Sequence, residues 1–161
     1  MKRALLVCLA LICTLSPAWG ASNRSSTPLK IKSDELHADN DKKTATFLGN
    51  VQARQGDLTL YADRLVISYG AKGKDLSRIE AFGNVRILQG NRQAFAAHAV
   101  YENQSGRIVL DGAPRVLEGK NEISGNVITY FVDEKRSIVT GKPNEPVRAI
   151  IFPEGKNGTK P

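Results

Sequence analysis

Residues 44–69, TATFLGNVQARQGDLTLYADRLVISY, decide the fold class of this chain. Within them, residues 58–62 alternate apolar and polar side chains, and the alternation continues after a step at Asp63-Arg64. A period of two is typical of half-buried strands. Two turn signals, Gly49-Asn50 and Gln55-Gly56-Asp57, divide the stretch. We therefore expect three short strands here.

Two short signatures recur along the chain around this stretch. The first is a glycine that opens or precedes a strand-like segment, found at Gly49, Gly83, Gly112 and Gly141, which lie 34, 29 and 29 residues apart. The second lies between these glycines, at Ser33–Leu36, Ala62–Leu65, Ala97–Val100 and Gly125–Ile128. Two signatures in the same order over four copies, with a period of roughly thirty residues, indicate stacked structural units.

The rest of the chain continues the strand pattern. Short alternating segments are separated by turns rich in glycine and asparagine, and no window has a sustained helical period. Residues 94–99 have helix propensity, but their alignment with the segment ending at Ala62 predicts a strand. Strands with one apolar side must bury that side on their neighbours. We therefore predict one all-β domain over residues 29–153.

The first twenty residues have the features of a cleaved signal peptide. Met1-Lys2-Arg3 is positive, residues 4–15 are apolar, and Ala18-Trp19-Gly20 offers the small residues of a cleavage site. We predict cleavage after Gly20. An uncleaved anchor is the weaker alternative, because the apolar run is short for a bilayer crossing.

Export would leave a chain without disulfides, because Cys8 and Cys13 both lie in the signal peptide. We predict a flexible leader over residues 21–28 and a disordered tail over residues 154–161. Loss of Lys2 and Arg3 leaves 21 basic and 16 acidic residues, a net charge of +5. This charge favours either an anionic partner or a well-solvated surface, and both alternatives stay open.

A search for catalytic or metal-binding patterns finds none that is convincing. His37 and His98 lie far apart, without cysteines or acidic residues at ligand spacing, and no phosphate loop or nucleophile motif occurs. The adjacent carboxylates of Asp34-Glu35 and Asp133-Glu134 would face opposite sides of a strand. We therefore expect no enzyme, no cofactor, no metal site and no nucleic-acid partner.

Several short motifs together resemble the LptA/OstA family of periplasmic lipopolysaccharide-transport proteins. The similar segments are Leu29–Asp34, Phe47–Val51, Leu60–Leu65, Gly125–Tyr130 and Val147–Pro153, so the resemblance covers roughly residues 28–153. In the fourth segment Asn126 stands where the family commonly has aspartate. The order and spacing of the motifs carry the resemblance more than any one of them.

The resemblance implies both a fold and a role. The fold would be a single, slightly twisted, V-shaped β-jellyroll of about sixteen short antiparallel strands. The role would be a periplasmic carrier that binds lipopolysaccharide through lipid A and passes it from the inner to the outer membrane. Its partners would be an inner-membrane anchored jellyroll, an outer-membrane translocon jellyroll, and further copies of itself.

A carrier of this kind needs an apolar trough for acyl chains. We expect the trough on the side that Leu58 and Leu60 occupy, although the same residues could simply fill the core, and a shift of one residue would turn a strand outward. The expected trough residues are Phe47, Leu58, Leu60, Leu65, Ile67, Ile79, Phe95, Val100, Leu110, Ile123 and Ile128.

Two further sets of residues are expected to contact phosphates and partner molecules. Basic residues near the trough rim would assist docking of lipid A phosphates, and the candidates are Arg54, Arg64, Arg86 and Arg92. Open strand edges would join copies head to tail. The expected edge residues are Leu29, Lys30, Ile31 and Lys32 at one end, and Val147, Arg148, Ala149, Ile150, Ile151 and Phe152 at the other. The alternative from another class is a structural or adhesive β-repeat scaffold that binds no lipid.

Overall fold

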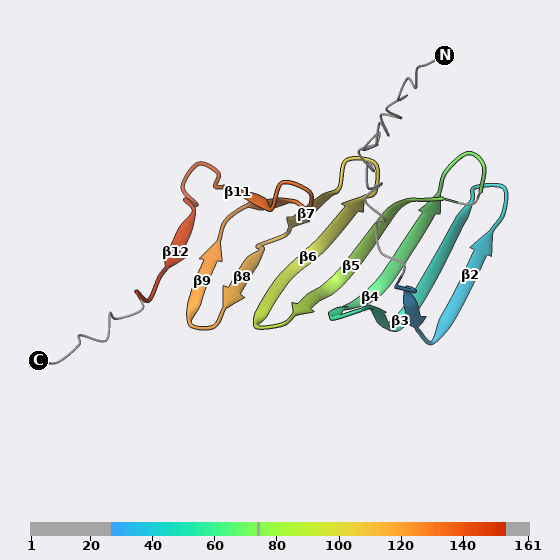
Figure 1. Cartoon of the computed structure of the whole chain (residues 1–161), viewed down its shortest axis with the longest axis horizontal. Helices are drawn as coiled ribbons and strands as arrows, with labels where there is room; N and C mark the ends of the chain where they lie inside the picture. Colours follow the sequence, from blue (N-terminus) through green and yellow to red (C-terminus); the bar gives the residue numbers. More distant parts are fainter. Residues whose placement is uncertain (1–26, 74, 154–161) are drawn as a thin grey trace, which may run out of the picture.

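The computed structural model describes residues 27–73 and 75–153, and these form one antiparallel sheet of twelve strands (Figure 1). The strands are β1 (Lys30–Lys32), β2 (Glu35–Asp39), β3 (Thr44–Gln55), β4 (Leu58–Tyr69), β5 (Leu76–Gln89), β6 (Arg92–Glu102), β7 (Arg107–Asp111), β8 (Arg115–Glu118), β9 (Asn121–Ser124), β10 (Val127–Phe131), β11 (Arg136–Thr140) and β12 (Arg148–Ile150). Over these ranges no helix has the length and hydrophobicity that a membrane crossing requires. The predicted all-β class is confirmed.

The stretch at residues 44–69 forms two strands, so the expectation of three was wrong. Gly56-Asp57 is the turn between β3 and β4. Gly49 and Asn50 instead form a bulge within β3, where the pairing with β4 jumps from Leu48 to Val51. Both residues have positive φ, +74° and +46°. A bulge bends a strand without ending it, which is why the turn signal did not divide β3.

Bulges in neighbouring strands line up, and the sheet folds along them. The register also shifts near Asp63 between β4 and β5, and near Gly83-Asn84 between β5 and β6. The four long strands β3–β6 therefore cross a common crease and contribute to two arms. We call them the β1 arm, which also contains β1, β8, β9 and β12, and the β2 arm, which also contains β2, β7, β10 and β11.

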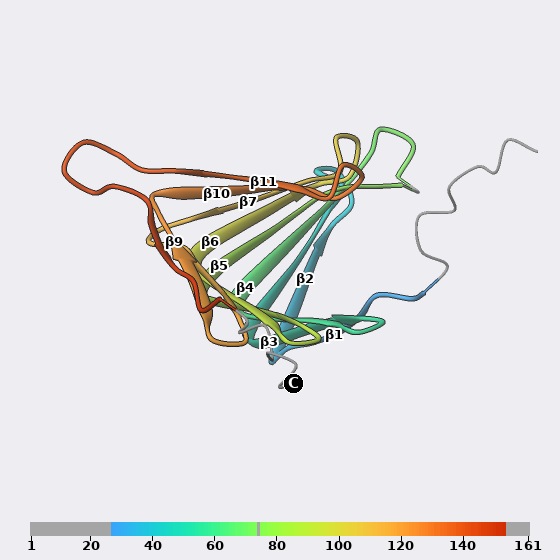
Figure 2. The same ribbon diagram turned by 60° about the vertical axis from the view of Figure 1, so that its left-hand side comes forward.

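The two arms give the sheet its V shape. In Figure 2, β7, β10 and β11 run along the top of the view, and β1 lies at the bottom. Residues 27–73 and 75–153 contain twelve strands rather than about sixteen. The difference arises because four strands run through both arms, and each of them would count twice if its halves were counted separately.

Residues of the two sequence signatures contact each other where the strands cross this crease. The Asn50 side-chain N–H donates to the Asp34 carboxylate at 2.8 Å, and Asn84 donates to Asp63 at the same distance. In each pair the aspartate comes from one signature, and the Gly-Asn from the other. In the third copy Ala97 takes the aspartate position and lies against Gly112. The period of roughly thirty residues is therefore the path of one hairpin unit across the crease.

The core lies between the arms, close to the crease. Val51, Leu65 and Val85 are at most 2 % exposed. Cross-strand pairing joins Leu65, Ala81, Ala99, Leu110 and Ile128 into one row that spans β4, β5, β6, β7 and β10. All five side chains are buried in the same cluster, so this row marks the inner side of the sheet.

Candidate lipid-binding site

The inner surface is an apolar trough with a packed floor and partly open walls. In the β1 arm, Ala62 is buried beside the crease, while Leu60 and Leu58, farther along the same strand, are only half-buried. In the β2 arm, exposure rises from 0 % at Leu65 to 38 % at Tyr69. Apolar side chains that stay partly in water gain free energy when another apolar group covers them.

Nine of the eleven expected trough residues have the predicted orientation. They lie on strands whose inward positions pack on the core or are paired with it, and they are Phe47, Leu58, Leu60, Leu65, Ile67, Ile79, Leu110, Ile123 and Ile128. Ile123 is placed by its pairing with the inward Val116 and is 38 % exposed. These residues form one continuous surface, and their contact with lipid stays a prediction.

Phe95 and Val100 lie on the outer side, so their assignment to the trough was wrong. Phe95 is paired with Arg86 and Arg115, and Val100 with Glu80. The cause is the third copy of the repeat. Ala97, rather than His98, occupies the position of Asp63 at the crease, so the alignment was displaced by one residue. The inner side of β6 is therefore lined by alanines, at positions 94, 96 and 99.

The sequence reasoning also missed several inner residues. Apolar side chains that pack on the same core are Ile31, Ala45, Val51, Ala53, Val85, Ile87, Ala94, Val116 and Val139. Most continue the period of two from an assigned residue, and extending the alternation to the end of each strand would have found them. Val116 in β8 and Val139 in β11 lie on short strands, and the pairing with neighbouring strands determines which side of the sheet they face.

Three of the four expected rim arginines lie on the outer side and do not line the trough. Arg54 is next to the inward Ala53, Arg64 is next to Leu65, and Arg86 is next to Val85. Adjacent strand residues face opposite sides, which explains the error. Arg92 lies at the end of the β1 arm beside the β5–β6 turn, where its Nε is 3.0 Å from Glu118 Oε1.

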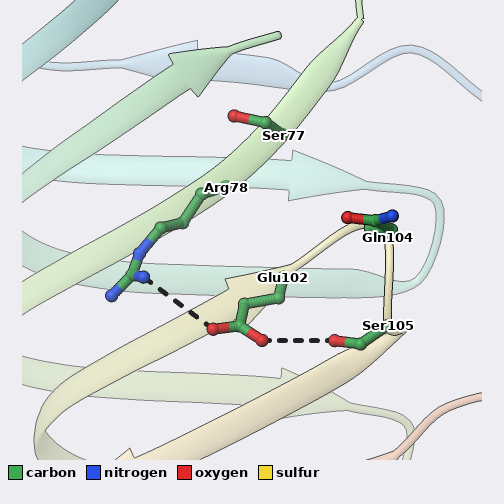
Figure 3. Close-up of a pocket in the computed structure, with 5 residues that line it drawn as sticks. All are labelled: Ser77, Arg78, Glu102, Gln104 and Ser105. Atoms are coloured by element: carbon green, nitrogen blue, oxygen red, sulfur yellow. Dashed lines mark hydrogen bonds and ion pairs between the residues drawn. The ribbon is translucent and has the colours of Figure 1, made fainter.

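A hollow of about 480 Å³ lies outside the trough, near the β6–β7 turn of the β2 arm (Figure 3). The five residues that line it all carry polar or charged groups: Ser77, Arg78, Glu102, Gln104 and Ser105. Arg78 lies 3.8 Å from Glu102, whose other carboxylate oxygen accepts from Ser105. Paired charges and hydroxyls suit water better than an acyl chain, so this hollow is no substitute for the trough.

Glu102 also interacts with an arginine that does not line the hollow. The Arg107 guanidinium donates to it at 2.7 Å. This hydrogen bond holds the pKa of the Glu102 carboxyl below its ordinary value of 4.5. The ionised carboxylate therefore joins β5, β6 and β7 at the outer end of the β2 arm.

The expected assembly edges lie at edges of the sheet. Among the described strands β1 pairs only with β3, and β12 only with β9. The β2 arm has edges of its own, which the sequence reasoning missed: β2 pairs only with β3, and β11 only with β10. Each end of the folded sheet therefore presents two strands with unpaired backbone groups.

No cluster of three metal-ligating side chains occurs among the residues that the structure describes. His98 does have acidic neighbours that its sequence context did not suggest. Its Nδ1 is 2.9 Å from Asp111 and its Nε2 is 3.5 Å from Glu80, and its ring stacks on Phe82. These groups lie on the outer side, away from the trough.

Comparisons with known proteins agree with this architecture. The family model described as LptA/(LptD N-terminal domain) LPS transport protein matches residues 30–136. The chain belongs to this family. Lipopolysaccharide transport is therefore its role, and the family is not one of enzymes.

Individual relatives are distant in sequence but extensive in coverage. The lipopolysaccharide export system protein LptA of Escherichia coli K12 is 27 % identical over 157 residues, which cover 92 % of this chain and 84 % of that protein. LptA of Haemophilus influenzae is 25 % identical over 160 residues, or 95 % and 93 % of the two chains. The crystal structure of LptH from Pseudomonas aeruginosa, described as an LptA-homologous periplasmic component, has a TM-score of 0.70. It covers 78 % of this chain and 96 % of its own at 18 % identity, and it supports the jellyroll fold.

Proposed function

We propose that this chain is a periplasmic carrier that shields the acyl chains of lipid A in its trough and passes lipopolysaccharide from the inner to the outer membrane. The observation that carries the proposal is the gradient of exposure along the inner side, from the buried Ala62 to the half-buried Leu60 and Leu58. Family membership supplies the class of cargo.

The physical need for a trough follows from the size of the cargo. Each methylene removed from water contributes about 0.8 kcal/mol, so exposing an acyl chain of about a dozen carbons costs on the order of 10 kcal/mol. Several such chains cannot cross an aqueous compartment uncovered. A sheet folded into a V can cover them between its arms while the sugars stay in solvent.

The carrier would act as one segment of a bridge. Its partners would be an inner-membrane anchored jellyroll and an outer-membrane translocon jellyroll, with further copies of itself joined head to tail. The open edges β1 and β12 support this arrangement, because unlike edges at opposite ends pair into an open row. A relationship to LptD-type proteins is consistent with jellyroll partners of the same kind.

Site-specific photo-crosslinking tests the trough. Crosslinkers at Leu58 and Leu60 should capture lipopolysaccharide, whereas one at Thr59, on the opposite side of β4, should not. Phe95 and Val100 serve as matched controls on β6, because they are apolar yet face outward. Capture at the outward positions alone would contradict the assignment of the inner side.

Native mass spectrometry separates the carrier from a lipid-free scaffold. Purified protein with added lipopolysaccharide should show a bound glycolipid, and Leu60→Asp should remove it. A protein that binds no lipopolysaccharide at high micromolar concentration would instead be a structural β-repeat whose apolar inner side only fills the core.

A further inference from the structure

The outer side of the β1 arm carries cations that lack carboxylate partners. We call it the basic face, and its members are Lys30, Lys32, Arg54, Arg86, Arg115 and Arg148, all of them exposed. Within the described part of the chain, none of the ion pairs involves any of these six. The carboxylate of Glu122 shares this side, because Glu122 alternates with the inward Ile123. The exposed carboxylates of Asp34 and Asp63 border it at the crease, where each accepts a hydrogen bond from an asparagine.

Pairing across the strands arranges part of the basic face in a row. Arg86 lies opposite Tyr61 on one side and Phe95 on the other, and Arg115 lies opposite Phe95. The Arg86 guanidinium is 4.9 Å from the centre of the Tyr61 ring, and that of Arg115 is 4.7 Å from the Phe95 ring. A guanidinium held on a ring keeps its N–H edges free to donate to anionic oxygens.

The outer side of the β2 arm is different. Arg78, Arg107 and Arg136 on that side each have a glutamate within 2.9 Å. Arg64, beside the crease, is the exception: its guanidinium lies over the Phe82 ring, and no ion pair of the described residues includes it. Asp111 and Glu35 add further negative charge on that side, through their pairing with the outward His98 and Leu48. Among the cations on the described strands that have no ion pair, six therefore lie on the outer side of the β1 arm and one, Arg64, lies on that of the β2 arm.

Exposed apolar side chains border the basic face at its C-terminal end. Ile150 is 55 % exposed and shares a side of β12 with Arg148, two residues away. Ile151 and Phe152 follow it, and both are more than half exposed. Cations beside exposed apolar side chains match a lipid surface, where phosphates attract the cations and the interface accepts apolar groups. A soluble acidic polymer would satisfy the charge but not the apolar side chains.

We propose that the basic face docks this protein onto a membrane surface rich in anionic phospholipids, with the β1 arm lying against the headgroups. This contact is separate from the trough, which opens on the other side of the sheet, and it does not depend on the cargo. Binding should weaken steeply with added salt, because the cations are exposed.

Vesicle flotation tests the proposal. The purified protein should float with vesicles of phosphatidylcholine and phosphatidylglycerol, and not with phosphatidylcholine alone. The triple variant Arg54→Gln, Arg86→Gln and Arg115→Gln should lose roughly a hundredfold in partitioning, since each cation near an anionic surface contributes about fivefold. The corresponding triple lysine variant keeps the charges and should retain binding.

A matched control removes the same charge elsewhere. Lys42→Gln, Lys72→Gln and Lys135→Gln change exposed turn residues of the β2 arm and should leave partitioning within a few-fold of the original. Ile150→Ser should weaken binding without any change in charge. Circular dichroism and thermal unfolding establish that each variant is folded, and crosslinking at Leu60 establishes whether the trough is intact.

Three outcomes would overturn the proposal. The first is a folded triple glutamine variant that floats as well as the original protein. The second is equal binding to neutral and anionic vesicles. The third is competition by soluble polyglutamate at an equal concentration of charge, which would identify a soluble polyanion as the better partner.

Discussion

At the scale of single residues, the crease depends on a contact between a glycine and an aspartate. Gly83 has a φ of +74°, and the Cβ of any other residue there would overlap the Asp63 carboxylate. The same carboxylate accepts a hydrogen bond from Asn84, the next residue, whose φ is also positive. Glycine is needed here both for its conformation and for the absence of a side chain.

Gly83→Ala should therefore lower the free energy of unfolding more than Gly90→Ala does. Gly90 also has positive φ, but no atom of the described residues lies within 4 Å of the place that its Cβ would take. Gly90→Ala should cost about 1–2 kcal/mol for the left-handed conformation, and Gly83→Ala should add about 1–3 kcal/mol of overpacking. Urea unfolding measures both.

A double variant identifies the source of the difference. Asp63→Ala in the Gly83→Ala background should recover part of the added cost, because it removes the closest contact. Equal costs for the two glycine variants, with no recovery in the double variant, would show that the crease does not depend on this contact.

At the scale of elements, the outer ends of β5, β6 and β7 are joined by charge. Glu102 on β6 accepts from Arg107 on β7 and lies near Arg78 on β5. The hydrogen bond from Arg107 lowers the pKa of Glu102. A carboxyl whose pKa is lowered by folding stabilises the folded state above its unfolded pKa, and this contribution is lost as the pH falls through the folded pKa.

Glu102→Gln should consequently lower the free energy of unfolding at neutral pH. The variant should then lose less stability than the original protein as the pH falls. The difference in unfolding free energy between the original protein and the variant should be largest above the ordinary carboxyl value of 4.5 and should shrink at lower pH. Urea titrations from pH 7 to pH 3 measure it. Glu134→Gln, which breaks an exposed pair with Arg136, is the control. A difference that stays constant across this range would mean that the carboxylate charge is not what joins the strands.

At the scale of the whole molecule, the described strands form an open sheet with two edge strands at each end. Closed barrels have no such edges, and an open sheet can extend by pairing with another chain. The two ends differ chemically, since Lys30 and Lys32 lie on β1 whereas apolar residues surround Arg148 on β12. Pairing of unlike ends gives a row of molecules rather than a closed dimer.

Deletion of residues 147–161 should abolish the head-to-tail rows. It should also abolish the contact with one of the two jellyroll partners at the membranes. The β fold and lipid capture at Leu60 should remain largely intact, because β12 pairs with β9 alone. Sedimentation at increasing concentration measures the assembly. Deletion of residues 154–161 alone is the matched control and should leave the rows unchanged. Rows of the same length from the longer deletion would contradict the role of β12.

The all-β class, the repeat and the side on which most apolar residues lie could all be predicted from the amino-acid sequence. These are local properties, because a period of two along one strand is visible without knowledge of its partners. Leu58, Leu60, Leu65 and Ile67 could be assigned to the inner side from their own strand alone.

The facing of β6 depended on its pairing in the folded sheet, because residues 94–97 are apolar on both sides and show no alternation of polar and apolar side chains. The pairing of Ala99 with Ala81 and Leu110 determines which side of β6 faces the core, and Phe95 and Val100 lie on the other side. Four of the five arginines that have no ion pair on the described strands lie on the basic face for the same reason, since neighbours in that row come from strands far apart in sequence. Register between strands is a relation among distant segments, and a single alternating segment does not contain it.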